Sequence, residues 1–290
     1  MRVFVTGATG FIGSAIIPEL ISANHEVVGL ARSDEAEAKL IALGAEVHRG
    51  SLEDIESLRR ATEASDGVIH LGFVHDISNY AKSSETDRRA IETIGEALGG
   101  TVKPFIVTSG TMCLADTELA TEESTTIYEC IRTPSERLAL ALADKGVRVS
   151  VIRLPPLVHG EGDNGFVPRL IKFAKDSGAS GYSGDGTNAW PSVHRLDAAR
   201  LYRLALEKAP AGSKLHAVAE EGVLVREIAE VIGRRLGMEV VSKPTEHFGF
   251  VGLIIARNNR TSSAITKLLL DWVPTEHGIL ADIEAHYFTE

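Results

Sequence analysis

Three glycines near the start of the chain constrain its fold more than any other feature. Gly7, Gly10 and Gly13 follow a short apolar run and precede residues 11–23, which have the apolar spacing of an amphipathic helix; residues 26–31 are again apolar. This order predicts a strand, a glycine turn, a helix and a second strand. In such a turn one glycine makes a tight bend, one lets the backbone approach a diphosphate, and one lets the helix pack on the strand. The flanking strand and helix favour this interpretation over a purely structural glycine-rich turn.

The end of the second predicted strand indicates which nucleotide binds there. An acidic residue at this point binds a ribose 2′-hydroxyl, whereas an arginine accommodates a 2′-phosphate. The sequence has Arg32 here, and Asp34 with Glu37 three residues later is typical of a helix start with Asp34 as N-cap. We therefore expect NADP rather than NAD, the alternative being an Arg32 that only points into water.

Net charge limits the partners of the chain. The 290 residues carry a formal charge of −10, which argues against a nucleic acid or an anionic membrane, because both need an extended basic face. NADP is itself an anion, so its binding has to depend on local donors such as the helix end and Arg32. An apolar content of 44% with mixed charges is typical of a soluble globular enzyme.

The cysteines, histidines and apolar runs of the sequence indicate the cell compartment of the protein and whether it binds a metal. Cys113 and Cys130 are too few and too unpatterned for a disulfide framework or a metal site, and they indicate a reducing compartment. The histidines show no ligand spacing such as H-x-x-x-H, so we expect no metal. No charged-then-apolar leader precedes the first strand, and no apolar run approaches about 18 residues. A cytoplasmic protein with no membrane partner is the simplest inference.

The remainder of the first half repeats strand and helix. Runs rich in Val, Ile and Leu without alternation indicate parallel strands buried on both faces. The alternation predicts an α/β fold, a Rossmann-type doubly wound parallel sheet with right-handed crossovers. The expected helices span 34–43, 53–61, 84–98 and about 128–144, and the expected strands span 46–48, 67–71, 104–108 and 147–153.

Ligands of such sheets bind outside the carboxyl ends of the strands. This rule selects Arg32 and the loops at 7–13, 50–52, 72–76, 109–113 and 155–160.

The second half of the sequence has a less regular pattern of predicted strands and helices. We expect a dinucleotide-binding core over 1–160 and a smaller α/β substrate lobe over 161–290 that packs on the core, with some segments returning to it. The glycine-rich stretch 178–186 is expected to form a hairpin or loop. Predicted helices in this half span 166–175, 195–207, 223–236 and 279–287, and predicted strands span 190–194, 214–219 and 239–242.

The whole pattern resembles the short-chain dehydrogenase/reductase superfamily, in its extended and atypical branches of the NAD-dependent epimerase/dehydratase kind. The resemblance spans nearly the whole chain. Besides the three glycines it includes residues 108–111 (Thr-Ser-Gly-Thr), Tyr128-x-x-x-Arg132 followed by Glu136, the run 153–156 (Arg-Leu-Pro-Pro), His159-Gly160, residues 193–197 (Val-His-Arg-Leu-Asp) and residues 270–274 (Leu-Asp-Trp-Val-Pro).

The resemblance implies a tyrosine as general acid and a lysine four residues on that binds the ribose and lowers the phenol pKa. Tyr128 fills the tyrosine position, but Arg132 stands at the lysine position. An arginine still favours a tyrosinate, since opposite charge lowers the pKa of an acid, yet it cannot give up a proton. The family asparagine that supports the lysine corresponds to Asp87, which could pair with Arg132. The alternatives are a Tyr128 that is a half-buried helix residue and an Asp87 that is a surface charge.

The family also uses a serine to position the carbonyl. Its position falls near Gly110, between Ser109 and Thr111. We expect Thr111 to take this role rather than Ser109, because an alternating strand end sends both side chains to the same side and Thr111 lies further out.

Further contacts are implied by the same resemblance. His75, His159, Trp190 and His194 are candidate substrate residues, although His194 could be structural and Trp190 could fill the small core of the lobe. Pro155 and Leu157 resemble the loop that holds the nicotinamide carboxamide by its backbone. The expected cofactor-binding residues are Gly7, Thr9, Gly10, Phe11, Ile12, Gly13, Arg32, Ser51, Leu52, Leu71, Gly72, Phe73, Thr108, Tyr128, Arg132, Pro155 and Leu157.

Three functions fit these expectations. The first is an NADP-dependent oxidoreductase of the carbonyl reductase type, in which a small, moderately apolar substrate takes a hydride from nicotinamide and a proton from Tyr128. The second is an NAD(P)-dependent epimerase or dehydratase of a sugar-like substrate. The third is a non-catalytic redox sensor that binds NADP. In each case we expect a monomer or a homodimer.

Overall fold

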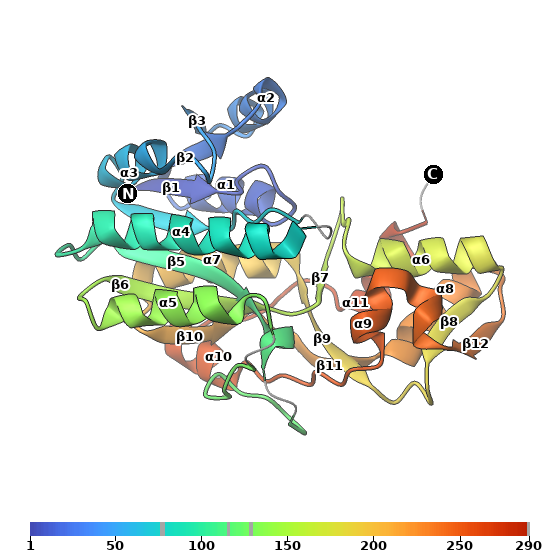
Figure 1. Ribbon diagram of the computed structural model, residues 1–290. Helices are drawn as coiled ribbons and strands as arrows, with labels where there is room; N and C mark the ends of the chain where they lie inside the picture. The colour runs from blue at the N-terminus through green and yellow to red at the C-terminus, as the bar shows by residue number, and fades with distance from the viewer. Residues whose placement is uncertain (76–78, 115–116, 128–129, 289–290) are drawn as a thin grey trace.

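A seven-stranded sheet forms the centre of the protein, and a smaller lobe lies beside the carboxyl ends of its strands (Figure 1). The computed structural model describes residues 1–75, 79–114, 117–127 and 130–288. The strand order is β10-β6-β5-β4-β1-β2-β3, and every neighbouring pair is parallel. The predicted doubly wound fold is thereby confirmed. The strands are β1 (Arg2–Thr6), β2 (Glu26–Ala31), β3 (Glu46–Arg49), β4 (Gly67–His70), β5 (Pro104–Gly110), β6 (Arg148–Leu154) and β10 (Ser213–His216).

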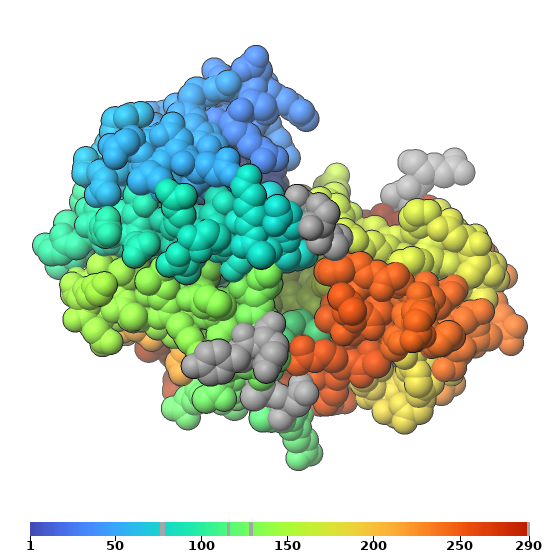
Figure 2. Space-filling model, in the orientation of Figure 1, coloured from blue at the N-terminus to red at the C-terminus, as the bar shows by residue number. Residues whose placement is uncertain are grey.

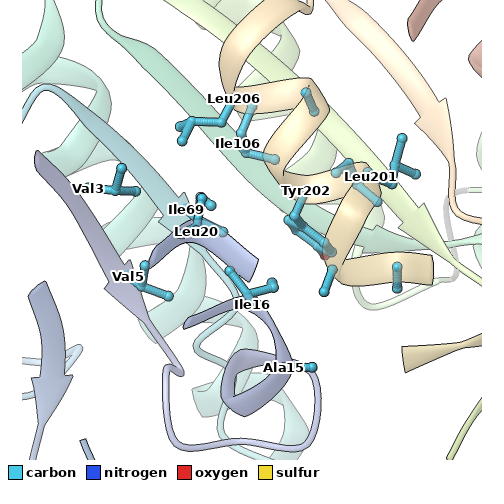
Figure 3. Close-up of a cluster of buried hydrophobic side chains, with 14 of the residues drawn as sticks. Val3, Val5, Ala15, Ile16, Leu20, Ile69, Ile106, Leu201, Tyr202 and Leu206 are labelled. Carbon is cyan, nitrogen blue, oxygen red and sulfur yellow. The ribbon is translucent and has the colours of Figure 1, made fainter. Parts of the chain in front are cut away.

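Alternate side chains along each strand pack into two separate apolar cores, one on each face of the sheet. In β1, Val3 and Val5 face one core and Phe4 faces the other. The first core is closed by α1 (Gly13–Ser22) and α7 (Arg195–Lys208), whose side chains meet those of the strands in Figure 3. Because both faces of the sheet are buried, the sequences of its strands are nearly continuous apolar runs.

The second core lies under three helices on the other face, where α4 and α5 run across the sheet in Figure 1. These helices are α3 (Ile55–Glu63), α4 (Tyr80–Leu98) and α5 (Thr133–Ala143). A glycine lets two of them approach closely: a Cβ on Gly95 of α4 would lie 2.4 Å from a methyl group of Leu142 of α5. The described helices are too short or too polar to cross a membrane.

The lobe has its own core, built on two small sheets. β9 (Ala189–His194) pairs with β7 (Leu157–His159) and β11 (Glu220–Leu224), and β8 (Ser180–Ser183) pairs in parallel with β12 (Val240–Lys243). Trp190 and Phe248 are among the fully buried side chains at its centre. The surrounding helices are α6 (Phe166–Ser177), α8 (Val225–Leu236), α9 (Gly252–Ile255) and α11 (Ile279–His286), with the 3-10 segment η3 (Thr245–Val251).

Three elements of the second half belong to the core. β10 is the edge strand of the large sheet, α10 (Ala264–Leu270) packs against β10, and α7 packs against α1, β4 and β5. The two strands expected at 214–219 and 239–242 therefore belong to different sheets. The expected loop or hairpin at 178–186 contains β8, whose partner β12 is distant in sequence and so left no local signal.

Several helix starts differ from the prediction by two to five residues: α1 begins at Gly13, α3 at Ile55, α4 at Tyr80 and α8 at Val225. The helix expected from about residue 128 begins at Thr133, where Pro134 occupies the first turn, a position that proline favours because it lacks an N–H. In α2 (Asp34–Ala42) the N-cap is Ser33 rather than Asp34, since the Ser33 hydroxyl accepts from the backbone N–H of Ala36 at 3.2 Å.

Candidate functional site

The glycine positions of the turn between β1 and α1 have no room for a side chain. Gly7 has a φ of +67°, and a Cβ there would lie 2.7 Å from the backbone nitrogen of Gly72. A Cβ on Gly13 would lie 2.2 Å from the carbonyl oxygen of Gly7, which accepts from the N–H of Gly10 at 3.0 Å. The turn is therefore pressed between the loop after β4 and the start of α1, as a diphosphate-binding turn requires.

The amino end of α1 is suited to an anion. No side chain caps this helix and no acidic residue lies in its first turn, so the backbone donors and the helix dipole are not neutralised locally. The Arg195 guanidinium, from the start of α7, lies 5.4 Å from the ring centroid of Phe11 in the turn and adds positive charge. The residues present fit a bound dinucleotide diphosphate.

Basic groups surround the end of β2. Arg32 is exposed there. The first turn of the following helix has three acids: Asp34 and Glu37 are paired with Arg49, at 3.0 Å and 3.1 Å, and Glu35 is exposed. Lys39, one helical turn further along α2, donates from Nζ to the carbonyl oxygen of Thr9 in the glycine turn at 2.7 Å. Sequence reasoning missed Lys39, because only the packing of α2 against the turn brings it there.

The ends of β3 and β4 complete this edge of the sheet. A Cβ on Gly72 would lie 3.1 Å from a methyl group of Leu52, so the loops after the two strands are in contact. Leu71 donates its backbone N–H to Thr6 at 3.2 Å, and the Ser51 hydroxyl accepts from the N–H of Glu53 at 3.3 Å. Of the residues expected in these loops, Gly72 thus lies against the glycine turn and Leu52 lies against Gly72.

Behind the edge runs a buried chain of polar side chains. The hydroxyl of Thr6 lies 2.8 Å from Nδ1 of His70, whose Nε2 lies 3.2 Å from the Asp87 carboxylate, and Arg132 donates to the same carboxylate oxygen at 3.3 Å. Thr6, His70 and Asp87 are buried. Burial raises the pKa of Asp87, but Arg132 and His70 outweigh it and hold the pKa below its usual value.

Arg132 is the centre of this arrangement. It also donates to the carbonyl oxygen of Thr108, and its guanidinium lies 4.3 Å from the ring centroid of Phe73. The structure therefore brings together four predicted residues, Arg132, Asp87, Thr108 and Phe73, and adds His70, which the sequence analysis had not singled out. Tyr128 lies outside the described residues.

The two candidate hydroxyls do not share a site. Ser109 donates to Glu136 at 2.6 Å, and Glu136 forms a buried ion pair with Arg153 at 2.6 Å. Thr111 instead donates to the side-chain oxygen of Asn259 at 2.7 Å. The expectation that alternation would send both side chains to the same side is wrong, because β5 ends at Gly110 and the 3-10 turn η2 (Thr111–Cys113) rotates the chain.

Among the candidate substrate residues, Trp190 and His159 are buried and contact other residues of the lobe. Trp190 is fully buried in the lobe core and donates from its indole to the carbonyl oxygen of Arg257 at 3.0 Å. His159 is buried and its Nδ1 lies 2.7 Å from the Asp282 carboxylate. Of the two open alternatives for Trp190, the structure shows the core-filling one.

His194 and His75 are more accessible. His194 is the N-cap of α7, and its Nδ1 accepts from the backbone N–H of Leu196 at 3.3 Å. His75 packs edge-on against the ring of Phe73, 5.1 Å between centroids. Loss of water around the imidazole lowers the pKa of His75, and the cations Arg132 and Arg169 lower it further, so the ring is neutral at pH 7.

Pro155 and Leu157 lie where the chain passes from β6 into the lobe. Both side chains are buried, Leu157 in the lobe core. The backbone role expected for this loop stays a prediction.

Two hollows lie at the junction of core and lobe. Figure 2 shows the surface hollowed between the core helices α4 and α5 and the lobe. A separate cavity of about 700 Å³ is lined by His194, Arg195, Asp163 and Tyr287, with residues of α6 and α11. Arg132, Asp87 and Thr111 do not line that cavity, so it is not where the predicted catalytic residues gather. In the described part of the chain, no cluster of His, Cys, Asp or Glu is arranged to hold a metal ion.

A disulfide joins Cys113 and Cys130, with their Cα atoms 5.2 Å apart. This bond corrects the expectation drawn from two unpatterned cysteines and with it the indication of a reducing environment. Their spacing of 17 residues carries no motif, and only the packing of η2 against the chain that enters α5 brings the sulfur atoms together.

Comparisons with known proteins agree with this geometry. The model of the NAD dependent epimerase/dehydratase family matches residues 3–218. An uncharacterised protein of Schizosaccharomyces pombe is 50% identical over 98% of this chain and 98% of its own length. The 2-alkyl-3-oxoalkanoate reductase of Stenotrophomonas maltophilia is 27% identical over 73% of this chain and 67% of its own length.

Among solved structures, the dTDP-glucose 4,6-dehydratase of Streptomyces venezuelae with bound NAD superposes with a TM-score of 0.79. It is 21% identical and covers 98% of this chain and 95% of its own, which shows a shared fold.

Proposed function

Because the chain belongs to the NAD-dependent epimerase/dehydratase family, we propose that it is an NADP-dependent oxidoreductase that reduces the carbonyl group of a small, moderately apolar substrate. The glycine turn carries this proposal: its three glycines and the uncapped end of α1 fit a dinucleotide diphosphate. A reductase of a 3-oxoalkanoate among the relatives supports carbonyl reduction over sugar chemistry.

The preference for NADP rests on the charges around the end of β2. Arg32 is exposed where a 2′-phosphate would lie, and Lys39 reaches the glycine turn beside it. Asp34 and Glu37, which would repel a phosphate, are paired with Arg49. Two cations, with two of the three acids of this helix start paired to Arg49, favour the extra phosphate of NADP.

When bound, NADPH supplies the hydride. Arg132 would bind the nicotinamide ribose, since it is anchored on Asp87 and Thr108 and cannot turn away. Tyr128 is the proposed proton donor to the carbonyl oxygen, a role that we assign from its place four residues before Arg132 in the sequence. A nearby cation would favour the ionised form of a tyrosine after its proton has left. The arginine binds and orients but takes no part in proton transfer.

For the hydroxyl that binds the substrate carbonyl we propose Thr111 rather than Ser109. The partner of Ser109 is the carboxylate of Glu136, and a charged hydrogen bond inside the core is expensive to break. The partner of Thr111 is the neutral amide of Asn259, which a carbonyl oxygen replaces with less loss.

The cofactor part of the proposal is tested by fluorescence titration of NADPH and NADH. The wild-type protein should bind NADPH more tightly, and Arg32→Ala should weaken NADPH binding about tenfold or more, because a charge-assisted hydrogen bond is lost, while leaving NADH unchanged. Lys175→Ala, which removes an exposed cation of α6, is the matched control. Equal affinity for both nucleotides would remove the role proposed for Arg32.

The reaction is tested with a panel of aldehydes, ketones and enones, scanned for NADPH oxidation. Turnover of a carbonyl compound should fall by about 10² to 10⁴ in Tyr128→Phe, the range expected for loss of a general acid, without loss of NADPH binding. NADPH binding without turnover of any compound would contradict the reductase and favour the redox sensor.

A further inference from the structure

Four aromatic side chains form a row across the junction of core and lobe. Phe73 follows β4, and its ring centroid lies 5.1 Å from that of His75 and 6.1 Å from that of Tyr80, the first residue of α4. The ring of Tyr80 in turn lies 6.5 Å from that of Phe250, with an angle of 14° between the two ring planes. Because Phe250 belongs to η3 of the lobe, the row joins the two parts of the molecule.

The row begins at Arg132. The guanidinium of Arg132 lies 4.3 Å from the ring centroid of Phe73 and is fixed by its bonds to Asp87 and Thr108. Arg132 is the residue proposed to bind the nicotinamide ribose. The aromatic rings therefore start beside the reactive end of the proposed cofactor and continue from there to the lobe.

Three of these rings are not part of the hydrophobic interior. Phe73, Tyr80 and Phe250 are each partly exposed, and none belongs to the apolar cores that the described residues form. Phe248, two residues before Phe250 in the same 3-10 segment, is instead buried in the lobe core. Partly exposed aromatic side chains that gather beside a proposed cofactor site are typical of a ligand-binding surface.

We propose that Phe73, Tyr80 and Phe250 bind the planar, conjugated part of the substrate, so that the enzyme prefers aromatic and conjugated carbonyl compounds to saturated ones of the same size. This inference rests on the proposed function and names its substrate class. A planar π system packs on aromatic faces and edges and gains contact energy beyond the area that it buries. A saturated ring of similar size gains only the burial of its apolar surface.

The test compares benzaldehyde with cyclohexanecarbaldehyde, which has the same number of carbon atoms but no π system in its ring. NADPH oxidation gives kcat/KM for each aldehyde, and the ratio of the two values is compared between wild type and variant, so that the different reactivities of the aldehydes cancel. Phe250→Leu and Tyr80→Leu keep an apolar side chain and remove the ring. Each should lower the ratio about threefold or more in disfavour of benzaldehyde.

Phe173→Leu is the matched control. It makes the same change at another partly exposed ring of the lobe, whose ring contacts are with His247 and Phe248. Its ratio should stay within about twofold of the wild type. Rings that only hold the lobe on the core would affect both aldehydes alike, so equal losses for the two aldehydes in Phe250→Leu and Tyr80→Leu, or an unchanged ratio in both, would overturn the proposal.

A binding measurement keeps this test separate from that of the proposed function. Saturation-transfer NMR of the NADPH-loaded protein should show benzyl alcohol binding about threefold or more tightly than cyclohexylmethanol, and Phe250→Leu should remove the difference. Equal binding of the two alcohols to the wild type would overturn the aromatic site even if the aldehydes are reduced. Failure to bind NADPH would refute the proposed function, and the same comparison on the protein without NADPH would then decide whether the rings bind an aromatic compound.

Discussion

At the scale of single residues, the buried carboxylate of Asp87 decides where Arg132 lies. A charge this deep is retained only if it is paired, and Asp87 has Arg132 on one side and His70 on the other. Removing one partner of a buried ion pair leaves the other charge uncompensated, which is more damaging than loss of an exposed pair.

We therefore expect Asp87→Asn to lower the free energy of unfolding by about 1–3 kcal/mol and to weaken NADPH binding about tenfold, because Arg132 loses its anchor. Glu96→Gln is a control on the same helix, since it removes an exposed pair with Arg59 and should change stability by less than about 1 kcal/mol. Urea unfolding and NADPH titration measure both. Equal losses in the two variants would show that Asp87 does not act through the buried pair.

At the scale of elements, the join between β1 and α1 depends on atoms that glycine lacks. The amino end of α1 touches the carbonyl oxygen of Gly7, so the helix can approach the turn only without a Cβ at Gly13. The same approach points the free backbone donors of the helix toward the carboxyl ends of the strands.

Gly13→Ala should therefore displace α1 and weaken NADPH binding at least about 100-fold, with a loss of stability of about 1–3 kcal/mol from overpacking. Gly110→Ala adds the same methyl group to extended backbone, where the nearest atom lies 3.7 Å away, and should change stability by less than about 0.5 kcal/mol. Unfolding curves and titration of both variants make the comparison. A Gly13→Ala protein that binds NADPH normally would contradict the close approach.

At the scale of the whole molecule, a buried polar network connects core and carboxyl-terminal segments. Nε2 of His216 in β10 lies 3.2 Å from Arg153 of β6, and its Nδ1 lies 2.7 Å from the carbonyl oxygen of Ser262. Burial lowers the pKa of His216 to about 4, against the opposing effect of Ser262. The imidazole is thus neutral in the folded protein and donates to Ser262, and Arg153 donates to it.

This pKa gives stability a pH dependence. In the unfolded chain His216 takes up a proton below about pH 6.5, whereas the folded protein resists protonation down to about pH 4, so acid favours unfolding in this window. The loss of unfolding free energy amounts to at most about 3.5 kcal/mol, since the shift is about 2.5 pKa units and each unit contributes about 1.4 kcal/mol. Urea unfolding from pH 4 to 8 should show a shallower slope for His216→Gln than for the wild type; equal slopes would disprove the contribution.

The order of strands and helices, the parallel sheet and the glycine turn follow from the amino-acid sequence alone, because apolar periodicity and the backbone freedom of glycine act over a few residues. It also indicated the pairing of Asp87 with Arg132, through spacing shared with the family. The cytoplasmic location and the oligomeric state stay predictions.

Which distant side chains meet depends instead on the packing of the folded chain. Lys39 at Thr9, His70 behind Asp87, the disulfide, and Ser109 turned toward Glu136 all depend on how helices pack on the sheet. The membership of β10 in the core sheet does as well. Such contacts join segments that have no common period or motif, so they arise from the packing of whole elements and leave no trace in the local sequence pattern.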